Sequence, residues 1–73
     1  MSKGYITILT EIYNINQVEG IEYLTYNVRV AKDVEDLYSK YDYNCGTDKE
    51  KAIKLAEKIH RDQKTEDLIY NYA

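Results

Sequence analysis

The chain contains no proline, phenylalanine or tryptophan, and it has only one cysteine, one histidine and three glycines. A single cysteine excludes an internal disulfide, and one cysteine with one histidine cannot supply the four ligands of a structural zinc site. Very small domains usually rely on such supports or on self-association. Because the first two are missing, we expect the chain to form a homodimer.

Long apolar runs are also missing. No uninterrupted stretch approaches the roughly 20 residues that cross a membrane as a helix, and no apolar signal-peptide core follows Met1 to Gly4. The 73 residues are 44% hydrophobic and 32% charged, which is typical of one folded domain. We expect a single domain over residues 1–73, located in the cytoplasm and not in a membrane.

The first half of the chain has the pattern of a β-hairpin. Residues 5–15 are rich in β-branched and aromatic types, and residues 21–30 alternate between two sets of side chains. Residues 16–20 form a turn-like cluster between them, in which Gly20 can adopt a positive φ. The sequence therefore predicts two long antiparallel strands.

One face of this hairpin is expected to meet the core. The predicted core positions of the two strands are Ile6, Ile8, Ile12, Leu24, Tyr26, Val28 and Val30. The opposite face then carries a tyrosine-rich, moderately apolar set made of Tyr5, Leu9, Tyr13, Ile21 and Tyr23. Surfaces of this composition often mark an interface.

Two helices and one further strand are expected after the hairpin. Asp33 is placed to cap a short helix over residues 34–41, and residues 42–46 break the helical period and predict a loop. Thr47 and Glu50 match a capping box that opens a long helix over residues 48–63. Residues 65–72 alternate like a third strand, although their beginning also fits the cap of a final helical turn.

The resulting fold class is α+β with the order ββααβ, a small antiparallel sheet with its helices packed on one face. The helices are expected to complete the core with Leu37, Leu55, Ala56 and Ile59. The long helix also offers Glu50–Lys54 and Glu57–Arg61 as i, i+4 ion pairs.

Catalytic chemistry is not expected. Cys45 and His60 would lie at opposite ends of a helix about 24 Å long, too far apart for a nucleophile and its base. The Asp and Glu residues match no calcium-binding loop, and Asp33 and Asp48 are explained as helix caps. We therefore predict a protein that is no enzyme and uses no metal and no cofactor.

The net charge of −3 is unevenly distributed. Residues 33–50 hold six acids against Lys40 and Lys49, with tyrosines among them. Carboxylates on a rigid scaffold can imitate a phosphate backbone and occupy the basic groove of a nucleic-acid-binding protein. The predicted protein-binding residues are Tyr5, Tyr13, Tyr23, Asp33, Glu35, Asp36, Tyr38, Tyr41, Asp42 and Tyr43.

A basic stripe on the long helix supports an alternative function. Lys51, Lys54, Lys58 and Arg61 are spaced three, four and three residues apart and could follow a row of phosphates. Neighbouring glutamates are expected to pair with two of these residues, and a charged outer face is usual for a helix on a sheet. Nucleic-acid binding is therefore the second choice.

In style, the whole chain resembles the small orphan proteins of phages and mobile elements in low-GC Gram-positive bacteria. It shares their short length, their richness in Tyr, Lys, Ile, Asn and Asp, and a hairpin followed by a capped helix. The stretch from Tyr26–Val30 to Thr47–Ile59 is also similar to the arm-binding domains of phage integrases, although their basic sheet face is missing. The first resemblance implies an anti-defence inhibitor such as an anti-CRISPR protein or a uracil-DNA glycosylase inhibitor.

The residues and the resemblance together give one functional prediction. We expect a phage-type accessory protein that inhibits or modulates a host defence or nucleic-acid-processing protein by stoichiometric binding in the host cytoplasm. Its contact surface would be the tyrosine face or the acidic segment 33–50.

Overall fold

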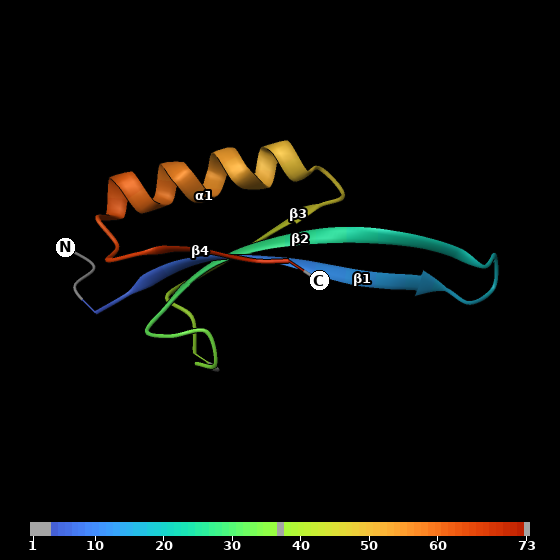
Figure 1. Cartoon of the computed structure of the whole chain (residues 1–73), viewed down its shortest axis with the longest axis horizontal. Helices are drawn as coiled ribbons and strands as arrows, with labels where there is room; N and C mark the ends of the chain where they lie inside the picture. Colours follow the sequence, from blue (N-terminus) through green and yellow to red (C-terminus); the bar gives the residue numbers. More distant parts are fainter. Residues whose placement is uncertain (1–3, 37, 73) are drawn as a thin grey trace.

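The computed structural model describes residues 4–36 and 38–72. In chain order they form the following elements: β1 (Ile6–Asn16), β2 (Ile21–Ala31), β3 (Tyr41–Gly46), α1 (Lys49–Gln63) and β4 (Leu68–Asn71). Figure 1 shows the helix on one side of the sheet. The α+β class is confirmed, but the order ββααβ is wrong, because the described residues form βββαβ with one helix.

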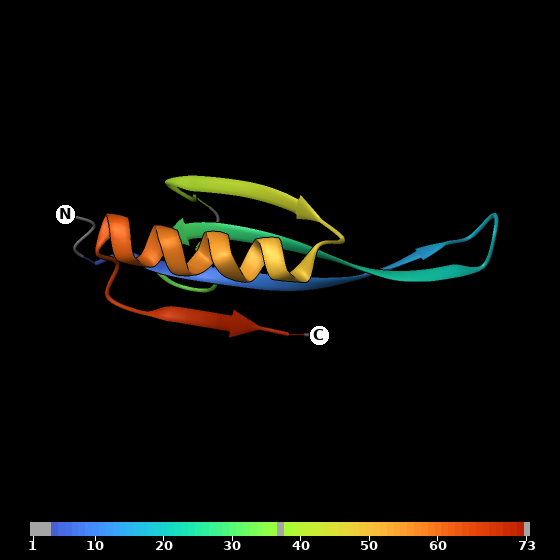
Figure 2. The ribbon, with the colours of Figure 1, turned by 90° about the horizontal axis from the view of Figure 1, so that it is seen from above.

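The four strands form one mixed sheet in the order β3-β2-β1-β4. β1 and β2 pair antiparallel along their full length, from Ile6 opposite Ala31 to Asn16 opposite Ile21. β3 pairs antiparallel with β2, whereas β4 pairs parallel with β1 over Thr7–Thr10. In Figure 2, α1 crosses above the central pair, and this crossover makes the parallel pairing of β4 possible. The predicted C-terminal strand is confirmed, but the sheet is not purely antiparallel.

The core lies between α1 and the sheet face beneath it. Its buried members are Leu9, Tyr26, Val28, Val30, Cys45, Ala52, Ala56 and Ile59. Ala52 and Ala56 are fully buried, so the helix approaches the sheet through its smallest side chains. Leu55 packs against this cluster from the side. The predicted core positions in β2 from Tyr26 onward and in α1 are confirmed.

The face of β1 that meets the helix differs from the prediction. Leu9 is fully buried in the core opposite Val28, and Thr7 on the same face is also fully buried. Ile12 points to the other side and is 44% exposed, and Leu24 of β2 is 37% exposed. Both alternating sets of β1 contain apolar residues, so the period of two alone could not assign the faces.

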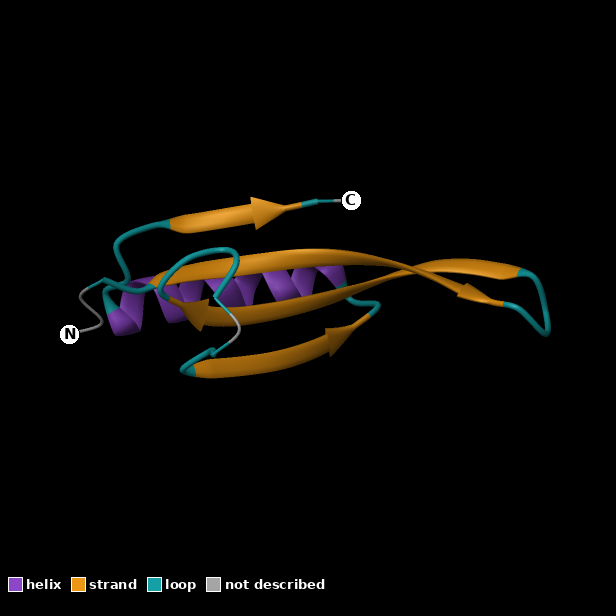
Figure 3. Cartoon of the chain, turned by 90° about the horizontal axis from the view of Figure 1, so that it is seen from below, coloured by secondary structure: helices purple, strands orange, loops and turns teal. Residues whose placement is uncertain are grey.

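The far face of the sheet is partly covered by loop residues 32–36 and 38–40, and Figure 3 shows this loop crossing beneath the two central strands. The Arg29 guanidinium fixes this loop, because it donates to the carbonyl oxygens of Asp36, at 2.6 Å, and of Val34. Ile8, opposite Arg29, and Ala31 are fully buried on this side. The sheet therefore has a small second buried region.

The predicted short helix over residues 34–41 is wrong. The Asp33 carboxylate accepts the backbone N–H of Glu35 at 2.9 Å, and the Asp36 carboxylate accepts those of Tyr38 at 3.0 Å and Lys32 at 3.3 Å. Short acidic side chains that bind nearby backbone N–H groups compete in this way with helix formation. The core prediction for Leu37 lies outside the described residues.

Strand β3 replaces the loop predicted over residues 42–46. Tyr41 and Tyr43 are good strand formers and lie opposite Val30 and Val28. The register shifts next to Tyr26, and the extra residue in β3 is Cys45, which is buried in the core. A β-bulge therefore brings an apolar thiol inward near the end of the strand.

Helix α1 begins one residue later than the capping box predicted. Asp48 is the N-cap, and its carboxylate accepts the backbone N–H of Lys51 at 3.0 Å. The helix ends at Gln63, and its C-cap, Lys64, has a left-handed backbone and donates its N–H to the His60 carbonyl oxygen. The long helix predicted over residues 48–63 is confirmed.

Replacement of Asp48 by alanine is expected to lower the free energy of unfolding by about 1 kcal/mol, because the cap supplies an acceptor to an otherwise unpaired N–H. Thr47→Ala is the matched control, since the structure assigns no cap contact to Thr47. Urea titrations followed by circular dichroism measure both. A larger loss for Thr47→Ala would restore the predicted capping box.

The turn after α1 directs the chain back along β1. The hydroxyl oxygens of Thr65 and Thr7 are 2.8 Å apart and buried, and the Thr65 hydroxyl also lies 2.5 Å from Nδ1 of His60. The backbone N–H of Glu66 donates to the Tyr5 carbonyl, and that of Thr7 donates to the Asp67 carbonyl, both at 2.9 Å. These contacts fix the position of β4.

The β1–β2 hairpin extends beyond α1, β3 and β4, the elements that pack against it or pair with it. The 15 residues of α1 span roughly 22 Å, whereas the 11 residues of each hairpin strand span roughly 36 Å. β4 reaches only Thr10 and β3 only Tyr26. Residues 11–25 therefore project beyond the helix in all three views of the whole chain and extend the molecule to 45 × 23 × 16 Å. These residues are named the arm.

Candidate functional site

The arm carries more than half of the large exposed apolar side chains among the described residues. Seven of the twelve large hydrophobic residues found exposed in the described part of the chain belong to it, namely Ile12, Tyr13, Ile15, Val18, Ile21, Tyr23 and Leu24. Val18, at the tip, is 96% exposed and Ile15 is 55% exposed. Single exposed apolar residues are normal, whereas seven of them on the two faces of one projecting segment indicate a segment that binds a partner.

Hydrogen bonds hold the arm in one conformation. The Asn16 carboxamide oxygen accepts the backbone N–H groups of Val18 and Glu19, and the Gly20 N–H donates to the Asn16 carbonyl at 2.7 Å. Gly20 has φ +68°, which this tight turn requires and which glycine adopts without strain. The tip is therefore built to present Val18 and does not need a partner to define its shape.

Side chains brace the arm across its two strands. The Tyr26 hydroxyl donates to the Glu11 carboxylate at 2.8 Å, and the Asn14 amide donates to the Thr25 hydroxyl at 2.9 Å. The hydrogen bond with Glu22 raises the pKa of Tyr13, and the hydrogen bond with Glu11 raises that of Tyr26. Both phenols are therefore neutral donors at physiological pH.

The arm carries charge of one sign. Glu11, Glu19 and Glu22 are its acids, and residues 11–25 contain no lysine or arginine. Neither β3 nor β4 extends along it, so the outer edges of both arm strands have no strand partner among residues 4–36 and 38–72. The arm thus combines apolar area, negative charge and open backbone edges.

The predicted tyrosine face is not assembled as one surface. The β1–β2 register places Tyr5 and Tyr13 on the helix side of the sheet and Tyr23 on the far side. Tyr5 packs against the core, whereas Tyr13 and Tyr23 lie in the arm. The split follows from the inverted face of β1, because inverting one strand separates residues that were expected to share a side.

The acidic residues of segment 33–50 are largely engaged within the protein. Asp33 and Asp36 bind backbone N–H groups of the loop, and Asp42 accepts from the Asn27 side chain at 2.5 Å. Glu35 is exposed. Because Asp33 and Asp36 hold the loop in shape, their carboxylates are less free to imitate a row of phosphates. The acidic segment is therefore less suited to phosphate mimicry than its composition suggested.

Three further predicted tyrosines lie around β3. Tyr41 and Tyr43 stack with ring centroids 6.3 Å apart, and Tyr41 is half-buried against the core. Tyr38 is 84% exposed in the loop. Tyr41 and Tyr43 belong to β3, which forms the edge of the sheet opposite β4.

Acid is expected to loosen the loop formed by residues 32–36 and 38–40. The backbone N–H groups of Tyr38 and Lys32 lower the pKa of Asp36 below its ordinary value. The carboxylate therefore stabilises the fold above an unfolded-state pKa of about 4, and this contribution is lost as the pH falls through the lower folded-state pKa. The amide chemical shifts of Lys32 and Tyr38 should titrate together in this range. Titration at the ordinary carboxyl pKa would contradict the assignment.

The basic stripe lies on the exposed side of α1, as expected. Lys51, Lys54, Lys58 and Arg61 are all exposed. The predicted Glu50–Lys54 and Glu57–Arg61 ion pairs are wrong, because the one salt bridge found among the described residues joins Arg61 to Asp62 at 3.5 Å. Exposed glutamates still alternate with the bases along the helix, so the stripe is not purely positive.

Cys45 and His60 do not form a pair. Cys45 is buried next to the start of α1, and burial raises the pKa of its thiol. His60 lies in the last turn of the helix and contacts Thr65. The described residues contain no group of three or more potential metal ligands, and no helix among them is long and apolar enough to span a bilayer.

Comparisons of the chain with protein-family models, with curated proteins and with solved structures found no match. The functional inference therefore depends on the geometry of the molecule itself. Sequence analysis identified the hairpin and two tyrosines of the arm but missed its projection. The projection could have been predicted from the sequence, because the two expected strands are together with their turn longer than the expected helix can cover.

Proposed function

We propose that this protein acts by stoichiometric binding to another protein and that the arm is its main contact. The observation that carries this proposal is the concentration of seven exposed apolar side chains on a ribbon that projects from the domain. In keeping with the resemblance noted above, the protein would inhibit or modulate its target as a phage-type accessory protein does.

The energetics of a free ribbon favour a partner. Two-stranded hairpins are marginally stable in water, and this arm leaves Ile15, Val18 and Ile21 to the solvent. Burial of each such side chain contributes about 1.5–3 kcal/mol. Because the turn and the cross-strand contacts already fix the arm, binding costs little conformational entropy.

The charge of the arm specifies the kind of partner. Three glutamates without a neighbouring base fit an apolar cleft rimmed by lysine or arginine. Such clefts are usual in proteins that bind nucleic acid, which agrees with a host defence or nucleic-acid-processing protein as the target. The same charges oppose the pairing of two arms, so a homodimer would have to form through another surface.

A capture experiment tests the proposal. The arm variant Ile15→Ser/Val18→Ser/Ile21→Ser is compared with wild type and with a control, Val34→Ser/Tyr38→Ser, that replaces exposed apolar residues outside the arm. Photo-crosslinking from position 18 identifies the target, and titration with the purified target gives affinity and stoichiometry. We expect a 1:1 complex that the arm variant weakens at least about tenfold and the control leaves intact.

The other outcomes are equally informative. If the control weakens the complex and the arm variant does not, the contact lies in segment 33–50 and the arm proposal fails. The alternative function, a nucleic-acid-binding regulator, keeps some support because Lys51, Lys54 and Lys58 have no ion pair among the described residues. It replaces the proposal if capture is abolished by nuclease treatment and by Lys51→Gln/Lys54→Gln/Lys58→Gln.

A further inference from the structure

One edge of β1 is covered by β4 only in part. Across this edge the backbone N–H of Thr7 donates to the Asp67 carbonyl, and the last residue of β1 that β4 pairs is Thr10. Backbone groups alternate between the two edges of a strand, so every second residue from Thr7 onward directs its N–H and C=O toward this side. Beyond the end of β4 these residues are Tyr13 and Ile15, and no strand in the described part of the chain pairs with them there (Figure 2).

The open edge of β1 lacks the usual protections of an edge strand, which are lysine, proline, a β-bulge or a very short length. β1 pairs with β2 from Ile6 to Asn16 without a shift in register, and residues 11–16 contain neither lysine nor proline. β4, by comparison, is only four residues long. The edge of β1 in the arm is therefore regular enough to accept a further strand.

The other edge of the arm, along β2, is less suitable. The Lys40 N–H donates to the Val30 carbonyl, so even-numbered residues of β2 direct their backbone groups toward β3, and Leu24 lies on this edge beyond β3. The register shifts between Tyr26 and Asn27, just where the open part of this edge begins. A β-bulge increases the local twist and interrupts the ladder, which hinders the addition of a continuous strand.

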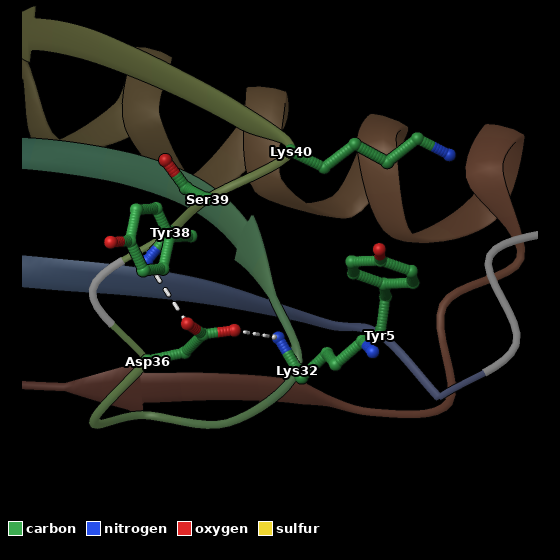
Figure 4. Close-up of a pocket in the computed structure, with 6 residues that line it drawn as sticks. All are labelled: Tyr5, Lys32, Asp36, Tyr38, Ser39 and Lys40. Carbon is green, nitrogen blue, oxygen red and sulfur yellow. Dashed lines mark hydrogen bonds between the residues drawn. The ribbon is translucent and has the colours of Figure 1, made fainter.

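The opposite end of the sheet carries the protection that the arm lacks. Tyr5, Lys32, Asp36, Tyr38 and Lys40 lie together there. Figure 4 shows the Tyr5 ring between the two lysines, whose ammonium groups lie 6.0 Å and 5.4 Å from the ring centroid. Lysines beside strand ends hinder the addition of another strand. Residues 11–25 contain no lysine, so strand addition is favoured at the arm.

The two faces of the arm define what an added strand must carry. On the helix side, Glu11 lies two residues before Tyr13 and Glu22 is hydrogen-bonded to Tyr13, and neither glutamate has a salt bridge in the described part of the chain. On the far side, Ile12 is 44% exposed. Because side chains of paired strands alternate in step, the added strand needs bases on the helix side and apolar residues beside Ile12.

We propose that the target adds an extended strand of alternating basic and apolar residues to the outer edge of β1, where it pairs with Tyr13 and Ile15. This inference rests on the proposed function and specifies its contact. Backbone hydrogen bonds hold the strand, and a lysine or arginine beside Glu11 selects it. A second copy of the chain is a poor occupant of this edge, because the glutamates of two arms would meet.

Amide hydrogen exchange followed by two-dimensional NMR tests the site in the whole protein. In the free protein, the amide hydrogens of Tyr13 and Ile15 should exchange faster than those of Ile12 and Asn14, which bond to β2. The probe is a capped peptide of alternating valine and lysine that is long enough to span the arm. Its saturable binding should slow exchange at Tyr13 and Ile15 at least about tenfold.

Two control peptides make the exchange test specific. One alternates valine with glutamate, and the other has the same valines and lysines in separate blocks. Neither should slow exchange at Tyr13. The inference is overturned if the valine–lysine peptide gives no protection, if it protects Leu24 instead, or if either control peptide binds equally well.

A backbone modification separates this inference from the proposed function. Chemical ligation at Cys45 gives a chain with a methyl group on the Tyr13 amide nitrogen, which blocks the outer edge of β1 and leaves every side chain unchanged. N-methylation of Leu24, on the other edge, is the matched control. Capture of the target should be weakened at least about tenfold by the first modification and unchanged by the second.

The captured target distinguishes two kinds of failure. If the chain methylated at Tyr13 still captures the target but the arm variant with three serines does not, the arm binds through its side chains, so the proposed function stands and the added strand is wrong. Equal loss of capture for both methylated chains would also overturn the added strand. If the arm variant captures the target as wild type does, the proposed function and this inference fail together.

Discussion

Replacement of Leu9 by alanine is expected to lower the free energy of unfolding by about 3 kcal/mol. Leu9 is fully buried, lies opposite Val28 and belongs to the core cluster under α1. The substitution removes apolar burial and leaves a cavity that a helix and a rigid sheet cannot close. Small domains have about 5–15 kcal/mol of stability in total, so this loss should be visible as a large decrease in the urea midpoint.

Ile12→Ala is the matched control on the same strand. Ile12 was the residue expected in the core from the sequence, but it is 44% exposed in the arm. Its replacement should therefore cost less than about 1 kcal/mol. If Ile12→Ala were the more damaging of the two, the face of β1 described above would be wrong and the sequence prediction would be right.

Enlargement of Ala56 to leucine is expected to destabilise the protein by about 2 kcal/mol. Ala56 is fully buried where α1 crosses the sheet, and Ala52 one turn earlier is fully buried as well. A leucine at this position must push the helix away from Leu9 and Val28 or adopt a strained rotamer. Thermal unfolding followed by circular dichroism measures the effect.

Lys54→Leu on the same helix separates packing from the general effect of an added leucine. Lys54 is exposed, and lysine and leucine have similar helix propensities, so the free energy of unfolding should change by less than about 0.5 kcal/mol. An increase in stability for Ala56→Leu would show that α1 lies farther from the sheet than its buried alanines imply.

Much of the fold could be predicted because local signals agreed with the tertiary structure. The hairpin had alternating strands and a turn containing Gly20, and the long helix had an apolar stripe that includes Ala56 and Ile59. The final strand also follows its pattern. In these segments the periodicity, the caps and the turn residues all favour the same element.

Other features could not be predicted because local signals were balanced. β1 has apolar residues on both faces, and Ile8 is in fact buried beneath the Arg29-anchored loop while Leu9 is buried beneath the helix. Asp33 was interpreted as a helix cap and Asp36 lay inside the predicted short helix, but in the structure both carboxylates bind loop N–H groups. Which of two local arrangements forms depends on contacts that the sequence pattern does not encode.

The candidate site was only partly accessible from the sequence. Tyr13 and Tyr23, which were predicted as protein-binding residues, are exposed in the arm, but Ile15 and Val18 were not selected, because their exposure depends on where the helix ends.

The parallel pairing of β4 with β1 affects the order in which the protein can assemble. Thr7 lies beside Leu68, so synthesis must proceed at least as far as Leu68 before β1 gains its second neighbour. During translation, that edge of β1 and the face of the sheet that α1 later covers stay open to other chains. We therefore expect the nascent protein to reach its final shape only after residues 68–71 have left the ribosomal tunnel, and more slowly than a helical protein of equal size.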